Sequence, residues 1–462
     1  MTAPTLDPAL FKAYDIRGVV TTALTPAAVT RIGAAIGARA LAAGVPRVCV
    51  GRDGRLSGPA LRDALIDGLT SVGTDVVDIG MVPTPLLYFS TVQLGTGSGV
   101  EITGSHNPPE YNGLKMMLGG TTLHGDAIQA LRLAIEAGPA VPAANRGSVT
   151  VADVQDAYLA AVTGSVTLAR PMKIAIDAGN GVAGPTAVKL FRALGCEVVE
   201  LFTDIDGTFP NHHPDPAHPE NLQDLVRALR DTDAELGLAF DGDGDRLGVV
   251  TKGGNVIYPD RQIMLFAQDV LAHHPGAEII YDVKCTRALA PWIRQHGGVP
   301  TMWRTGHSLI KAKLKETGAP FAGEMSGHLF FNDRWPGFDD GMYAGARLLE
   351  IVSRVADPSA LLDALPNALN TPELQLRTAE GENFALVERL RAGARFEGAT
   401  DVITIDGVRA EWPDGFGLAR ASNTTPVVVL RFEGDDAAAL ERIQTAFRKA
   451  ILAVAPGVQL PF

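Results

Sequence analysis

The chain has 462 residues, of which 46% are hydrophobic and 20% are charged, a composition typical of a globular protein with several domains. Its 40 basic and 52 acidic residues give a net charge of −12, which argues against a nucleic-acid partner because phosphate backbones would be repelled. Three distant cysteines, Cys49, Cys196 and Cys285, predict reduced thiols without a disulfide framework. No 18-residue apolar run and no basic, apolar leader is present, so we expect a cytoplasmic protein with no membrane partner.

Short apolar strands alternate with amphipathic helices over most of the sequence. Strands are predicted at 47–50, 75–79, 173–176, 197–202 and 278–283. Beyond residue 371 the pattern changes to shorter strands and one closing helix at 435–454. From the proline- and glycine-rich breaks we expect domains at 1–150, 151–252, 253–367 and 368–462. The alternation indicates an α/β protein with parallel or mixed sheets, followed by a small α+β unit.

Three carboxylates gather directly behind a predicted buried strand. Asp241, Asp243 and Asp245 alternate with glycines after the apolar run at 236–240, and such spacing lets the side chains converge on one point. Hard oxygen ligands of this kind favour Mg²⁺ or Ca²⁺. An EF-hand is excluded because its sixth and twelfth positions, glycine and glutamate, would be arginine and lysine here. An acidic surface turn is the plainer alternative.

A polar loop at 103–115 carries a serine near its centre. Gly104 and two prolines, Pro108 and Pro109, fix a non-helical backbone that would hold Ser105 as a nucleophile or an acceptor of a phosphoryl group. The elbow sequence of lipases is absent from this loop. A structural loop serine is the alternative.

Two later segments combine polar groups with glycine turns. Glu324 and Ser326 stand in GEMSGH and could meet sugar hydroxyls, and His307 and His328 are candidate proton carriers. The segment 420–425, RASNTT, joins one guanidinium to several hydroxyl and amide donors, a composition suited to binding phosphate. Structural histidines and a polar hairpin turn are the alternatives.

Two further patterns are weaker. The segment 179–184, GNGVAG, follows a strand and fits the dinucleotide-binding turn, with Glu200 ending the next strand. Close contacts in a strand-to-helix turn would explain the same glycines. His212, His213 and His218 could hold zinc, but no regular spacing organises them, and we favour a solvated loop.

Taken together, TGSHNPPEYNGLK, DGDGDR, GEMSGH and RASNTTP stand in the order of the four signature loops of the α-D-phosphohexomutases. The chain resembles this family from Tyr14 to its last strand, and is most similar to the bacterial phosphomannomutase/phosphoglucomutase branch around FAGEMSGHLFFNDRWPGFDDGMY. The resemblance implies four domains around a central cleft: three similar α/β domains with mixed sheets and a smaller α+β domain. A departure is Gly104, where many relatives have alanine.

The resemblance implies reversible phosphoryl transfer between the 1- and 6-positions of mannose and glucose phosphates. Phospho-Ser105 would be the donor, a bisphosphorylated hexose the intermediate, and hexose 1,6-bisphosphate the activator. Mg²⁺ would be held by a Ser105 phosphate oxygen with Asp241, Asp243 and Asp245. The implied catalytic residues are Ser105, Arg17, Lys115, His307 and His328. The implied substrate contacts are Tyr14, Arg246, Lys284, His307, Glu324, Ser326, Arg420, Ser422, Asn423 and Thr424.

The principal proton carrier among Lys115, His307 and His328 is left open. We expect activity on both sugars, because they differ only at C2 while Glu324 and Ser326 would contact O3 and O4. A glucosamine phosphomutase, an NAD-dependent oxidoreductase and a non-catalytic sugar-phosphate-binding protein are the alternatives. We expect a monomer whose partners are small phosphosugars, and whose basic residues converge on the cleft around Ser105: Arg17, Lys115, Arg246, Lys284 and Arg420.

Overall fold

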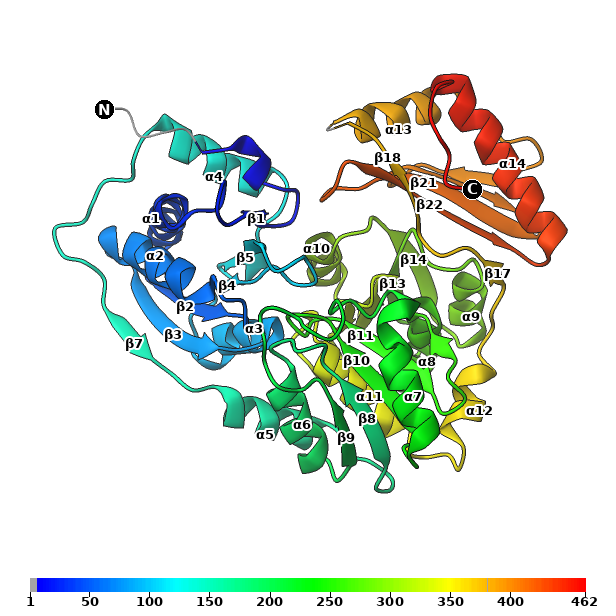
Figure 1. The fold of residues 1–462 in the computed structure, drawn as a ribbon, viewed down its shortest axis with the longest axis horizontal. Helices are drawn as coiled ribbons and strands as arrows, with labels where there is room; N and C mark the ends of the chain where they lie inside the picture. Colours follow the sequence, from blue (N-terminus) through cyan, green and yellow to red (C-terminus); the bar gives the residue numbers. More distant parts are fainter. Residues whose placement is uncertain (1–5, 380) are drawn as a thin grey trace.

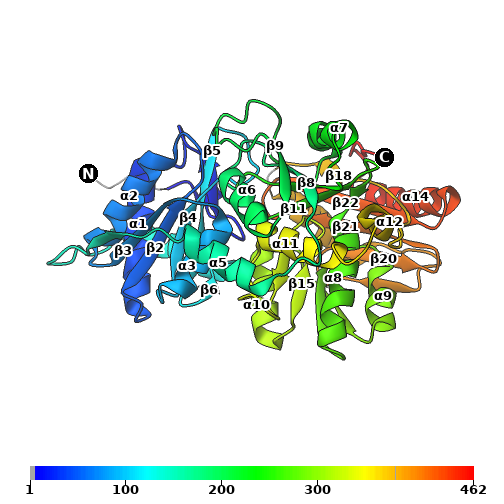
Figure 2. The ribbon, with the colours of Figure 1, turned by 90° about the horizontal axis from the view of Figure 1, so that it is seen from below.

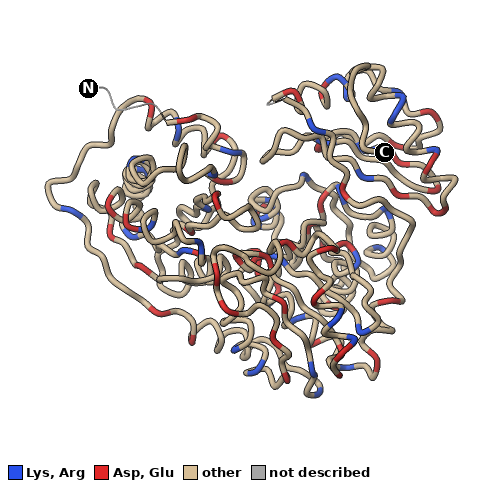
Figure 3. Tube along the Cα trace, in the orientation of Figure 1, with Lys and Arg blue, Asp and Glu red and all other residues tan. Residues whose placement is uncertain are grey.

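The computed structural model describes residues 6–379 and 381–462, which form four β-sheets with helices against them (Figure 1). Figures 1 and 2 show the N-terminal sheet at one end of the molecule, the C-terminal sheet at the other, and the second and third between them. Both signs of charge are spread over every part of the chain (Figure 3). Among the described residues, no helix is both long and apolar enough to span a membrane.

The first sheet is mixed, in the order β1-β5-β4-β2-β3-β7, with β6 on β5. Its central strands β2 and β3 are parallel and each buries four consecutive residues, as strands covered on both faces do. The strands are β1 (Ile16–Val19), β2 (Arg47–Arg52), β3 (Asp75–Met81), β4 (Gly99–Ile102), β5 (Tyr111–Leu118), β6 (Thr121–Thr122) and β7 (Val149–Val151). The helices are η1 (Pro8–Leu10), α1 (Pro26–Ala42), α2 (Gly58–Ser71), α3 (Thr84–Gln93) and α4 (Asp126–Ala137).

The second and third sheets are also mixed, in the orders β12-β11-β10-β8-β9 and β14-β13-β15-β16. The second contains β8 (Lys173–Asp177), β9 (Glu197–Leu201), β10 (Leu236–Phe240), β11 (Leu247–Thr251) and β12 (Val256–Ile257), with α5 (Gln155–Ser165), α6 (Gly184–Ala193), η2 (Pro219–Leu222) and α7 (Gln223–Asp231). The third contains β13 (Glu278–Asp282), β14 (Val299–Trp303), β15 (Phe321–Gly323) and β16 (Leu329–Phe331), with α8 (Pro259–His273), α9 (Leu289–Gln295), α10 (His307–Thr317), α11 (Gly341–Val352) and α12 (Pro358–Asp363).

The fourth sheet is antiparallel, in the order β17-β22-β21-β20-β19, with β18 on β22. Its strands are β17 (Leu369–Asn370), β18 (Leu374–Arg377), β19 (Asp401–Ile403), β20 (Val408–Trp412), β21 (Gly415–Ala421) and β22 (Val427–Gly434). The helices α13 (Glu382–Gly393) and α14 (Ala437–Val454) pack against it.

A continuous apolar core joins the first three sheets. Trp335 belongs to this core: its ring stacks on Tyr343 of α11 at 4.3 Å and on Phe89 of α3 at 5.9 Å between centroids. The fourth sheet has a separate core. It is attached to the third sheet by buried arginines, since Arg409 donates to main-chain oxygens of residues 283 and 285, and Arg431 to Asp260.

The structure confirms the predicted fold class: three mixed α/β sheets precede a smaller α+β unit. The predicted strands correspond to β2, β3, β8, β9 and β13, and the closing helix to α14. The predicted domain limits at 150, 252 and 367 stay a prediction.

Candidate active site

Ser105 lies in the turn after β4, in an unusual backbone conformation. Its φ is +48°, in the left-handed region that residues other than glycine seldom adopt. The side chain is buried, and Oγ donates a hydrogen bond to Asp241 Oδ2 at 2.8 Å. Oγ also lies 3.1 Å from Nδ1 of His106. The fold thus places Ser105 directly against the predicted metal-binding loop.

His106 is a neighbour that the sequence analysis did not single out. Burial, reinforced by Arg246 and Arg17, holds its pKa well below the usual value. The ring is therefore neutral near pH 7. Because the Ser105 hydroxyl hydrogen is donated to Asp241, a tautomer with a proton on Nδ1 can donate to Ser105 Oγ. Its position next to Ser105 in the loop was the sequence signal that could have found it.

The carboxylates of residues 241–245 converge at the end of β10. All three are fully buried, and their oxygens lie within 4.8 Å of one another. Gly244, with φ +79°, makes the turn between them. Lys115 Nζ lies 2.6 Å from Asp243 and 2.5 Å from Asp245. The Lys115 ammonium therefore compensates two of the three carboxylates.

These carboxylates differ in their ionisation. Burial, followed by repulsion from Asp243 and Asp245, raises the pKa of Asp241 well above its usual value. At Asp245, burial is outweighed by Lys115 and His328, which hold the pKa below its usual value. An added cation would favour ionised Asp241, because its positive charge would oppose the effects of burial and of the neighbouring carboxylates on this pKa.

Two histidines stand side by side next to the carboxylates. The rings of His307, at the start of α10, and His328 stack with centroids 5.4 Å apart. Burial alone would lower the pKa of His328, but Asp245, with Nε2 to Oδ1 at 3.3 Å, and Glu324 raise it to about 9. Burial and Lys311 lower the pKa of His307. Near pH 7 the pair therefore consists of one imidazolium and one neutral imidazole.

Other predicted residues surround this centre. Arg17 contacts Asn107 of the Ser105 loop at 3.0 Å. Arg246 Nε lies 3.8 Å from Asp241 Oδ2 and 3.4 Å from His328 Nε2. Ser326 Oγ lies 2.8 Å from Nδ1 of the same histidine.

A second cluster joins the fourth sheet to the first and third. Asn423 donates to the Tyr14 hydroxyl, which in turn donates to the main-chain oxygen of Thr305 at 2.6 Å. Arg420 pairs with Asp406 at 3.0 Å. The remaining predicted contacts are Lys284, paired with Glu373, and the adjacent hydroxyls of Ser422 and Thr424.

The predicted convergence of basic residues is therefore divided between two clusters. Arg17, Lys115 and Arg246 lie around Ser105. Lys284 and Arg420 belong to the second cluster, where both interact with the charge of Glu373. Glu324 lies between the clusters. Its carboxylate is 3.3 Å from His328, and its charge contributes to the raised pKa of Tyr14, after the larger effect of burial. Basic side chains thus lie at both ends of the site, and carboxylates lie beside them at each end.

The glycine turn at 179–184 and the histidine-containing loop at 212–218 each make contacts that hold the backbone. At Gly184 an added Cβ would lie 2.1 Å from the main-chain oxygen of Thr203, so the glycine permits a close backbone approach. His212 Nε2 lies 3.0 Å from Asp177 Oδ1, which ties its loop to the end of β8.

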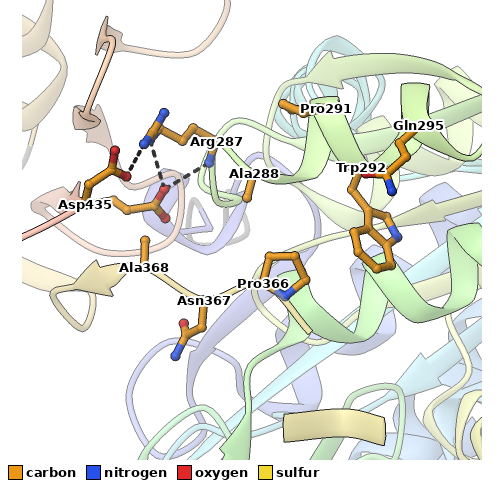
Figure 4. Close-up of a pocket in the computed structure, with 10 residues that line it drawn as sticks. Arg287, Ala288, Pro291, Trp292, Gln295, Pro366, Asn367, Ala368 and Asp435 are labelled. Atoms are coloured by element: carbon orange, nitrogen blue, oxygen red, sulfur yellow. Dashed lines mark hydrogen bonds and ion pairs between the residues drawn. The ribbon is translucent and has the colours of Figure 1, made fainter. Parts of the chain in front are cut away.

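Two cavities lie near the fourth sheet. One, of about 330 Å³, separates α9 from residues 366–368, with Arg287 and Asp435 paired at one side and Trp292 at the other (Figure 4). None of its lining residues is a predicted site residue. The other, of about 390 Å³, lies between residues 8–13 and the predicted phosphate-binding segment 422–426.

Comparisons with known proteins cover nearly the whole chain. Four consecutive regions match the descriptions phosphoglucomutase/phosphomannomutase alpha/beta/alpha domains I, II and III and the C-terminal domain, at residues 8–140, 156–254, 258–369 and 351–450.

Relatives match over almost their full length. A protein named phosphoglucomutase from Neisseria gonorrhoeae is 61% identical over 96% of each chain. One named phosphomannomutase/phosphoglucomutase from Pseudomonas aeruginosa is 54% identical, covering 100% of this chain and 99% of the relative. The crystal structure of a phosphoglucomutase/phosphomannomutase family protein from Burkholderia thailandensis is 61% identical, with a TM-score of 0.94 over 99% of this chain and 100% of that one.

Proposed function

This chain belongs to the phosphoglucomutase/phosphomannomutase family, and we propose that it is an isomerase interconverting the 1- and 6-phosphates of glucose and mannose. The observation that carries the proposal is the hydrogen bond from Ser105 Oγ to Asp241 beside a buried cluster of carboxylates. A serine placed there can accept and give up a phosphoryl group, because a cation bound by the carboxylates and the nearby basic side chains can offset the charge of that group. The names of the full-length relatives support the same reaction over the oxidoreductase and amino-sugar alternatives.

Phospho-Ser105 would be the phosphoryl donor. The bond from Oγ to phosphorus breaks as the free hydroxyl oxygen of the hexose monophosphate bonds to phosphorus, and the hydroxyl proton passes to a base. After the bisphosphate turns over, Ser105 Oγ bonds to the other phosphorus as the bond from that phosphorus to the sugar oxygen breaks, and the protonated base returns a proton to the sugar oxygen. Arg17, Lys115 and Arg246 would offset the charge of the transferred group.

The neutral state of His307 makes it our candidate for accepting the hydroxyl proton. Burial and Lys311 lower its pKa, so its free base is available near pH 7. His328, with a pKa of about 9, is charged at that pH and suits proton donation or charge compensation.

The second cluster would bind the phosphate that is not transferred. Arg420, Lys284 and the hydroxyl and amide groups of Ser422, Asn423 and Thr424 supply donors of the kind that phosphate oxygens accept. Tyr14 lies beside them through its contact with Asn423. Glu324 and Ser326, between the two ends, would bind the O3 and O4 hydroxyls in either orientation of the sugar.

The carboxylate cluster fits Mg²⁺. Its ligands are hard oxygens within 4.8 Å of one another, and Asp243 Oδ1 is buried without a hydrogen-bond partner among the described residues. We propose that Asp241, Asp243 and Asp245 hold Mg²⁺ with an oxygen of phospho-Ser105. Bound there, Mg²⁺ would supply positive charge to the transferring phosphoryl group.

Three further points are proposals. Hexose 1,6-bisphosphate would activate the enzyme by phosphorylating Ser105. The protein would act as a monomer and in the cytoplasm. Sedimentation of the purified protein tests whether it is a monomer, and fractionation of cells tests whether it is cytoplasmic.

The test is ³¹P NMR of the purified protein with Mg²⁺ and a trace of hexose 1,6-bisphosphate. Glucose 1-phosphate, mannose 1-phosphate and glucosamine 1-phosphate are supplied in separate samples, with Ser105→Ala as the control variant. We expect 6-phosphates from glucose and mannose with the wild type only. Turnover of glucosamine 1-phosphate alone would redirect the assignment to the amino-sugar mutases, and full activity of Ser105→Ala would overturn the role of the serine.

A further inference from the structure

Arg55, in the turn after β2, is enclosed by the loop that carries Ser105. Its side chain is 0% exposed, and Nη2 donates to the main-chain oxygens of Ser105 at 2.8 Å and Asn107 at 2.6 Å. Nη1 donates to the main-chain oxygens of Pro108 at 2.6 Å and Tyr111 at 3.0 Å. One guanidinium therefore binds four carbonyl oxygens of a single loop.

Asp53 completes this arrangement on the other side of Ser105. Its Oδ2 accepts from Arg55 Nε at 3.2 Å, from Thr103 Oγ1 at 2.8 Å and from the amide of Gly104 at 3.2 Å. Thr103 Oγ1 in turn accepts from the amide of Ser105 at 2.8 Å. The ion pair of Asp53 and Arg55 thus fixes the backbone both before and after the serine.

The loop needs such support for two reasons. Ser105 has a φ of +48°, and a residue other than glycine stays in that region when its surroundings determine the conformation. Carbonyl oxygens that converge on one point also repel one another unless a donor lies between them. The planar fork of arginine supplies five N–H groups in a fixed geometry that matches several acceptors, whereas the three donors of lysine surround one point charge.

All five guanidinium N–H groups of Arg55 are used by these contacts, at Nε, Nη1 and Nη2. None is left to bind phosphate. Arg17 differs, because its Nε is buried without a hydrogen-bond partner among the described residues. Arg55 therefore acts on the reaction through the loop that it holds and not by binding phosphate. Its charge also interacts with Asp243, and Arg55→Lys keeps that charge while removing the planar fork.

We propose that Arg55 is a positioning residue for phosphoryl transfer, which fixes the backbone of residues 103–111 so that Ser105 Oγ faces Asp241. This inference rests on the proposed function. It predicts a loss in kcat with little change in KM, because the second cluster and the sugar-binding residues keep their geometry. A displacement of about 1 Å at the reacting oxygen lowers the rate by about 100-fold, and we expect that loss for Arg55→Lys.

The experiment compares Arg55→Lys and Arg55→Ala with wild type and with Arg62→Ala, a control on α2 whose side chain pairs with Asp63 and Asp78. We measure kcat, KM and the rate at which radiolabelled hexose 1,6-bisphosphate phosphorylates Ser105. Adding guanidinium at concentrations below those that unfold the protein should restore at least a tenth of the lost kcat in Arg55→Ala. Ethylammonium at the same concentration should not, because it lacks the planar fork.

Hydrogen exchange supplies a readout that does not depend on turnover. The amides of Asn107 and Tyr111 close turns in the loop, at 2.9 Å and 3.0 Å from their acceptors. They should exchange faster in both Arg55 variants and slow again with guanidinium in Arg55→Ala. Normal kcat and normal exchange in folded Arg55→Lys would overturn the inference. An inactive wild type whose loop still loosens in these variants would instead overturn the proposed function.

Discussion

Replacing Lys115 by methionine removes the ammonium that bridges Asp243 and Asp245 while keeping most of the side-chain length. Nζ lies 2.6 Å and 2.5 Å from the two carboxylates, and the three side chains are 4%, 0% and 0% exposed. Removing one partner of a buried ion pair costs about 3–5 kcal/mol, because the other charge stays buried without compensation. With two carboxylates affected, we expect the free energy of unfolding to fall by about 4 kcal/mol, within that same range.

The assay is urea unfolding near pH 7, in EDTA and in excess MgCl₂, for wild type, Lys115→Met and Lys189→Met. Lys189 is exposed and donates to Gln155 at 2.7 Å, so this control should change the unfolding free energy by less than about 0.5 kcal/mol. MgCl₂ should stabilise Lys115→Met more than wild type, because the cation would replace the lost positive charge. The difference in unfolding free energy between Lys115→Met and wild type should shrink at acid pH. Lys115 lowers the pKa of Asp245, and this interaction stabilises the folded protein only where the carboxylate is ionised. An unfolding midpoint equal to that of wild type in EDTA would refute this reasoning.

Three further substitutions test other parts of the structure. In Gly242→Ala an added Cβ would lie 2.3 Å from the main-chain oxygen of Ser105, so we expect kcat to fall by at least about tenfold and the thermal midpoint to fall because the backbone must shift; unchanged kinetics would contradict this close contact. Burial raises the pKa of Asp340 from 3.8 to about 7. The wild type should therefore lose stability as pH rises from about 4 to about 7, because the unfolded chain ionises this group first. Asp340→Asn should be equally stable at pH 4 and more stable by up to about 4 kcal/mol above pH 7, and urea midpoints that differ equally at both pH values would argue against it. Arg409→Met removes the contacts to residues 283 and 285, so limited proteolysis should cut faster between 366 and 370; an unchanged rate would show that the fourth sheet does not depend on this arginine.

The strands could be predicted because several are short apolar runs bounded by glycine turns, as at 173–176 and 236–240. The helix α11 was not predicted. All of its 12 residues are buried, and its charged residues Arg347 and Glu350 are held in ion pairs instead of forming a face exposed to solvent. Pairing with distant partners, rather than local periodicity, determines where such an element packs.

In the candidate site too, residues set by local spacing could be predicted, and residues set by distant contacts could not. The spacing of Asp241, Asp243 and Asp245 was sufficient to predict that their carboxylates converge on one point, because that geometry is local. Arg55 carried no such signal, since its role depends on contacts to a loop about 50 residues away. The separation of the basic residues into two clusters depends likewise on how four sheets meet.

The hydrogen bond between Ser105 and Asp241 joins residues 136 positions apart, and the contact between Tyr14 and Asn423 joins residues 409 apart. A ribosome makes the chain from its N-terminus, and domains fold as they emerge. The serine therefore leaves the ribosome long before the carboxylates exist, and in that nascent chain it is an ordinary alcohol. The segment that would grip the second phosphate is made later still, among the last residues translated. The surroundings of Ser105 are thus completed only after the second sheet has been made, and those proposed for the second phosphate only after the fourth.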